Sequence, residues 1–79
     1  MSHFAQVQIT PQAVNLLIGH TLTALRKVQG EGRKHRVRCA LRNLHNAKRV
    51  LDAGAPPALG WLYVNAAYWR LRTALVIAH

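Results

Sequence analysis

The segment from Arg33 to Asp52 constrains the fold of this 79-residue chain most strongly, because it predicts one helix with an apolar side and a basic side. At about 100° per residue, apolar side chains recur along one side: Val37, Ala40, Leu44, Ala47 and Leu51. Within an arc of roughly 60° on the far side, four basic side chains recur: Arg38, Arg42, His45 and Arg49. We therefore expect a rigid helix that buries its apolar side and presents arginines on the other.

The basic side of this helix is unfavourable to the isolated fold. Arg38 and Arg42 are four residues apart, and like charges at that spacing destabilise a helix by about 0.2–0.5 kcal/mol per pair. An anion lying on the stripe would remove this repulsion. We interpret the stripe as a polyanion-binding surface, together with the basic residues at the start of the helix: Arg33, Lys34 and Arg36.

The net charge of +9 is concentrated in this part of the chain, since nine of the eleven Lys and Arg residues lie between positions 26 and 49. Such a block favours nucleic acid, an anionic membrane or an acidic protein surface as partner. A solvated face that keeps a small protein soluble is the alternative. The chain is 51% hydrophobic, which is too apolar for a disordered polycation, so we expect it to fold.

A first helix is predicted at about residues 10–29. Thr10 and Pro11 are typical of a helix start, and Ile9 and Val14 have the spacing of a hydrophobic staple. Apolar residues then recur with a helical period: Val14, Leu17, Ile18, Leu22, Leu25 and Val28. Gly30 is interpreted as a left-handed cap at its end. Residues 1–9 are expected to form an extended arm.

The second helix is predicted at about residues 33–53, with Gly54 as its cap, and the third at about residues 57–78. The third is apolar nearly all round, which is typical of a helix that is centrally buried, spans a membrane or is covered by a partner. Its internal arginines disfavour membrane insertion, because each costs about 2.5–3.5 kcal/mol at mid-bilayer. Its stripe of Trp61, Tyr68 and Arg72 is a candidate protein-interaction surface, although aromatic side chains at this spacing also fill cores.

Catalytic chemistry is not indicated. The chain has two carboxylates, Glu31 and Asp52, and paired-carboxylate catalysis is not expected from residues placed at helix ends. His35 and Cys39 share a helix face, but a zinc site needs more ligands. No glycine-rich phosphate loop is present. We therefore expect no enzyme, no metal and no cofactor.

A cytoplasmic location is expected from the single cysteine and from the start of the chain. Cys39 has no second cysteine with which to form an internal disulfide, and small secreted domains usually depend on disulfides. No signal peptide is evident at the N-terminus.

The sequence thus predicts an all-α domain of three helices, in which the first two helices form a hairpin and the third packs across that pair. The domain is expected to be either a monomer or a dimer formed through surplus apolar surface. The leading functional hypothesis is a non-catalytic protein that binds nucleic acid through its second helix. The alternative is a small interaction module, such as a phage-type regulator or inhibitor, that binds an acidic or nucleic-acid-binding face of a larger complex. Peripheral binding to anionic membranes is a third interpretation.

Overall fold

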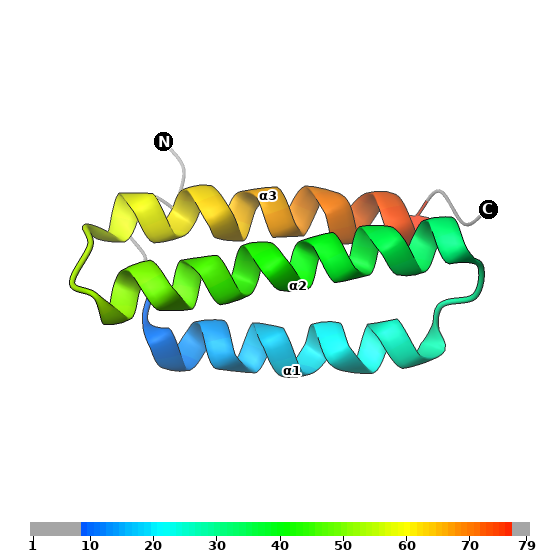
Figure 1. Ribbon diagram of the computed structural model, residues 1–79, viewed down its shortest axis with the longest axis horizontal. Helices are drawn as coiled ribbons and strands as arrows, with labels where there is room; N and C mark the ends of the chain where they lie inside the picture. The colour runs from blue at the N-terminus through cyan, green and yellow to red at the C-terminus, as the bar shows by residue number, and fades with distance from the viewer. Residues whose placement is uncertain (1–8, 77–79) are drawn as a thin grey trace.

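The computed structural model describes residues 9–76 and, within that range, consists of three helices joined by short turns (Figure 1). The helices are α1 (Pro11–Lys27), α2 (Glu31–Asp52) and α3 (Pro57–Val76). The prediction of an all-α fold with three helices is therefore confirmed. Residues 1–8 of the arm expected over residues 1–9, and the end of the third predicted helix, lie outside the described residues, whereas Ile9 is described and is buried in the core.

The three helices lie side by side with α2 in the middle, and consecutive helices run antiparallel (Figure 1). Along its principal axes the protein measures 36 × 28 × 15 Å, so it is a flat molecule. Both α1 and α3 pack chiefly on α2. The expectation that the third helix crosses the hairpin is wrong, because α3 lies along α2 instead of lying over both helices.

The start of α1 follows from its first residues. Thr10 has an extended backbone, and its Oγ1 accepts a hydrogen bond from the Ala13 amide at 3.1 Å. Pro11 occupies the first helical position, where its missing amide costs nothing. Ile9 and Val14 are both buried in the same hydrophobic cluster, as the staple predicts. The cap and the flanking apolar pair together set where α1 begins.

The turn between α1 and α2 differs from the prediction. Helix α1 ends at Lys27, and its cap is Val28 in an extended conformation. Gly30 does have a positive φ of 93°, but it caps the start of α2 and not the end of α1. Because the Gly30 carbonyl accepts from the Lys34 amide at 3.0 Å, α2 begins at Glu31, two residues before the expected start.

The end of α2 has the predicted glycine cap. Gly54 has a φ of 87°, a conformation that glycine adopts without steric cost. The Ala55 amide donates to the Val50 carbonyl at 2.9 Å, and the Gly54 amide donates to the Leu51 carbonyl at 3.0 Å. This pair of bonds is the Schellman motif. It turns the chain into the proline-containing connection that precedes α3.

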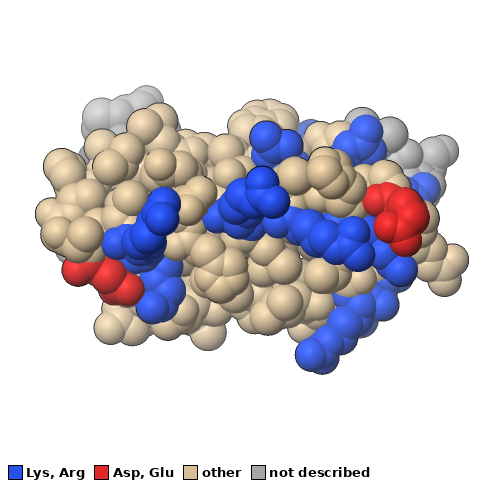
Figure 2. Space-filling model, in the orientation of Figure 1, with Lys and Arg blue, Asp and Glu red and all other residues tan. Residues whose placement is uncertain are grey.

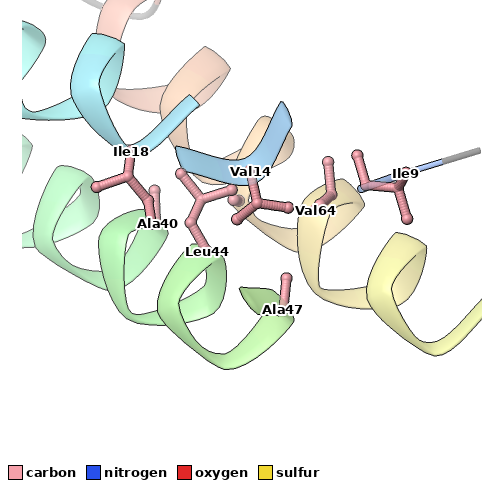
Figure 3. Close-up of a cluster of buried hydrophobic side chains, with 8 residues drawn as sticks. Ile9, Val14, Ile18, Ala40, Leu44, Ala47 and Val64 are labelled. Carbon is pink, nitrogen blue, oxygen red and sulfur yellow. The ribbon is translucent and has the colours of Figure 1, made fainter. Parts of the chain in front are cut away.

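The core lies between the apolar side of α2 and the inner sides of the two flanking helices (Figure 3). Its buried members come from α2 and from both of its neighbours: Ile9, Val14, Ile18, Ala40, Leu44, Ala47, Val64 and Ala67. Val37 is also fully buried, and Leu51 is half-buried. The predicted apolar stripe of α2 is thus confirmed as the central contributor to the core.

The apolar face predicted for α1 is buried only in part. Val14 and Ile18 are buried, whereas Leu17 is 37% exposed and Leu22 is 42% exposed. A helix at the edge of a layer contacts a neighbour along one narrow strip, and α1 packs mainly on α2. Side chains beside that strip therefore remain accessible.

Candidate polyanion-binding surface

The basic stripe, defined as Arg38, Arg42, His45 and Arg49, lies on the side of α2 opposite the core, and all four residues are exposed. Because α2 is the central helix, the stripe runs along the middle of one broad face. Figure 2 shows basic side chains along α2 on this face, with acidic side chains toward its two ends. Arg38 and Arg49 are eleven residue steps apart, a length of roughly 16 Å at 1.5 Å per residue.

The charges of the stripe are weakly compensated. Of the two carboxylates, Asp52 pairs with Lys48 at 3.1 Å, and Glu31 lies 3.8 Å from Arg38 Nη1. Both pairs are solvent-exposed, and such pairs contribute about 0–1 kcal/mol. Within residues 9–76, neither of these ion pairs includes Arg42. The stripe therefore retains most of its positive charge for an external anion.

Arg49 is held in place by a neutral neighbour. Its Nη2 donates to Asn46 Oδ1 at 3.0 Å. This hydrogen bond restricts the guanidinium without cancelling its charge. An oriented guanidinium loses less conformational entropy when it binds a phosphate.

Of the other basic residues grouped with the stripe in the sequence prediction, Lys34 lies one turn before Arg38 on the same side of α2, whereas Arg33 lies about 150° around the helix from the centre of the stripe. Arg33 and Lys34 are half-buried. Arg36 lies about 150° around α2 from the centre of the stripe, and it lines a small pocket with α3 residues. The structure thus separates Arg36 from the surface to which the sequence pattern assigned it.

The aromatic stripe of α3 is divided between two surfaces. Trp61 is half-buried, and with Tyr68 it lines an apolar groove of about 360 Å³. This groove lies between α1 and α3, and its lining residues are Ile9, Leu17, Trp61, Val64, Asn65 and Tyr68. Arg72, grouped with Trp61 and Tyr68 in the prediction, instead places its guanidinium 5.5 Å from the ring centre of Trp69.

Trp69 was not among the predicted site residues, although it is 59% exposed. Its ring packs edge-on against Tyr68, with a centroid distance of 5.5 Å and an interplanar angle of 76°. Arg72 three residues later was the signal in the sequence that could have identified it, because side chains at that spacing meet on a helix.

The remaining chemistry on the surface is sparse. Cys39 Sγ lies 3.6 Å from His35 Nε2 on the exposed part of α2. Over residues 9–76, no three His, Cys, Asp or Glu side chains are grouped as metal ligands would be. None of the helices in this described part has the length and hydropathy needed to cross a bilayer.

Comparisons of the chain with protein-family models, with curated proteins and with solved structures found no match.

Proposed function

We propose that this protein is a non-catalytic nucleic-acid-binding protein that contacts the phosphate backbone through the basic stripe of α2. The observation that carries the proposal is the placement of three arginines and a histidine on the exposed side of the central helix. Arginine binds phosphate oxygens through paired hydrogen bonds. Because the opposite side of α2 is buried in the core, the backbone positions of these four residues are fixed relative to one another.

The length of the stripe supports a nucleic acid over a small anion. Each strand of B-DNA carries one phosphate for about every 3.4 Å of duplex axis, so a stripe of roughly 16 Å is long enough to lie beside several phosphates. A single phosphate would use one or two of the four basic residues. A linear polyanion can contact them all.

The proposal is tested by fluorescence anisotropy with a labelled 20-nucleotide single strand and a matching duplex, between 50 and 200 mM salt as a rough range. We expect binding that weakens linearly on a logarithmic salt scale. Arg42→Gln should reduce the magnitude of the slope of log affinity against log salt concentration by about 0.9 for the duplex and about 0.7 for the single strand. The reason is that a protein with one phosphate contact fewer releases fewer counterions when it binds.

Lys27→Gln is the matched control. It removes the same charge from the last turn of α1, outside the stripe, and should leave the slope unchanged. Absence of binding at low salt, or binding that does not respond to salt, would contradict the proposed function. Equal effects of the two variants would show that net charge, and not the stripe, determines affinity.

A second candidate function is a protein-interaction module, for instance a small regulator or inhibitor of a larger complex. It is favoured by the apolar groove, where Tyr68 is 53% exposed and Leu17 is also accessible. Exposed aromatic side chains beside an apolar depression are typical of binding hot spots. The occupant in this candidate function is a larger protein.

The two candidates are separated by capture from lysate with and without nuclease, with the mass of the free protein measured alongside. Nucleic-acid binding predicts that captured material is lost after nuclease treatment and that Arg42→Gln weakens capture. The interaction module predicts nuclease-resistant capture that Tyr68→Ala weakens more than Arg42→Gln. A mass of twice the 8.8 kDa chain would identify a second copy as the occupant.

A further inference from the structure

A second basic site lies where α2 and α3 meet. It is a pocket of about 200 Å³ lined by Arg36 of α2 and by Trp69, Arg70 and Thr73 of α3. We call this the seam pocket. Two arginine residues from different helices line one small depression, and neither Asp nor Glu is among its lining residues. Its charge therefore suits an anion.

The aromatic wall of the seam pocket is held in place yet accessible. Trp69 is 59% exposed even though Arg72 and Tyr68 both contact its ring. The Thr73 hydroxyl donates to the Trp69 carbonyl at 2.9 Å, so its hydrogen is already used within the helix. The pocket thus offers a ligand a largely exposed tryptophan side chain beside two arginine residues.

This combination matches a nucleotide with an unpaired base. Stacking on a side chain requires a base with a free face. In a duplex the base faces are covered by neighbouring base pairs, whereas the bases of a single strand can lie on an aromatic ring. The pocket is smaller than the roughly 300–1,000 Å³ of sites that enclose a whole ligand. One phosphate and part of a stacked base would fill it and leave the strand free to continue in both directions.

We propose that the seam pocket binds one unpaired nucleotide of a single-stranded nucleic acid, with its base stacked on Trp69 and its phosphate held by Arg36 and Arg70. This inference rests on the proposed function and adds a preference to it. The basic stripe contacts backbone phosphates of either form, whereas the seam pocket contributes affinity only for single strands.

Two variants with one tryptophan each test the stacking directly, because the full chain contains two tryptophans. In Trp61→Phe all indole emission comes from Trp69, and in Trp69→Phe all of it comes from Trp61. We expect an unlabelled 20-nucleotide single strand to quench the first variant and not the second. The duplex should quench neither. Quenching of the second variant alone would place the strand in the apolar groove and overturn the inference.

Affinities provide a second measurement that does not depend on the Trp61 substitution. Trp69→Ala should weaken single-strand binding by about 5- to 150-fold, the range for loss of one stacked base. Duplex binding should change by less than about twofold, since it does not use the base stack. Trp69→Phe should recover most of the single-strand affinity because it retains an aromatic face.

The phosphate contact is tested with Arg70→Gln against Lys27→Gln, which carry the same change in charge. We expect the first to weaken single-strand binding more than the second. If the wild-type chain binds neither nucleic acid, the proposed function itself fails. If both nucleic acids bind and Arg42→Gln weakens both, while Trp69→Ala leaves the ratio of the two affinities unchanged, the proposed function stands and the seam pocket is refuted.

Discussion

Gly60 of α3 lies directly against the side chain of Leu51 of α2. A Cβ atom at Gly60 would be 2.9 Å from Leu51 Cδ2 and 3.0 Å from both Cδ1 and Cγ. Gly60 is also buried. The absence of a side chain at this position therefore lets the first turn of α3 approach the last turn of α2.

Gly60→Ala should consequently lower the free energy of unfolding by about 1 kcal/mol, because overpacking costs about 1–3 kcal/mol and the better helix propensity of alanine returns up to about 1 kcal/mol. Gly19→Ala is the control, since a Cβ there meets nothing within 4 Å. It should raise the free energy of unfolding by about 0.5–1 kcal/mol. Urea unfolding measures both. A stabilised Gly60 variant would show that Leu51 moves aside freely.

Thr10→Ala should destabilise the protein by about 1 kcal/mol, the usual cost of losing an N-cap side chain. The cause is loss of the bond from the Ala13 amide to Thr10 Oγ1. Thr10→Ser retains this acceptor and should be close to wild type. Thermal unfolding followed by circular dichroism provides the measurement. Equal losses in both variants would assign the effect to the threonine methyl group and not to the cap.

Asn43→Leu should raise the free energy of unfolding by about 1 kcal/mol. The Asn43 Nδ2 atom is buried, and no acceptor for it lies within the described residues. An unsatisfied buried donor costs about 1–3 kcal/mol, and leucine also has the higher helix propensity. Asn15→Leu, at an exposed position of α1, controls for propensity alone and should give a smaller gain in urea unfolding. A smaller gain at Asn43 than at Asn15 would contradict this account.

Arg42→Glu should weaken nucleic-acid binding more than Arg42→Gln does and yet stabilise the free protein by about 0.5 kcal/mol at low salt. It converts a repulsive pair with Arg38 into an attractive one, and the gain should shrink in 1 M salt because of screening. Lys27→Glu is the matched charge reversal, and it should lower the stability of the free protein because it places an anion in the last turn of α1. Denaturant titrations at two salt concentrations measure both. A destabilised Arg42→Glu protein would show that the stripe is not under repulsion.

The helices and the basic stripe were accessible from the sequence because they depend on local information. Thr10 with Pro11 marks the start of α1, and Gly54 marks the end of α2 through a left-handed conformation that favours glycine. The helical period then separates Leu44 on the buried side from Arg42 on the exposed side. These inferences need no knowledge of which helix is the neighbour.

The misplacement of Leu17 and Leu22 depends on the helices around α1, whereas that of Gly30 concerns which end of a turn the residue caps. The pattern of α1 indicated that Leu17 and Leu22 face a core, but α1 lies at the edge of the layer and both remain accessible. Gly30 was recognised as a turn residue but assigned to the wrong helix end. The helical period of a sequence gives the direction in which a side chain points from its own helix axis. It does not say whether another helix or solvent lies in that direction.

The sequence by itself determined that the second helix carries an apolar side and a row of arginines, because both follow from residue type and a rotation of about 100° per residue. The tertiary structure decided which cationic groups act together. Arg36 and Arg70 are 34 positions apart in the chain, and they line one pocket because α3 packs along α2. Packing between helices is set by side-chain fit over the whole interface, as at Gly60 and Leu51, and no local pattern contains that fit.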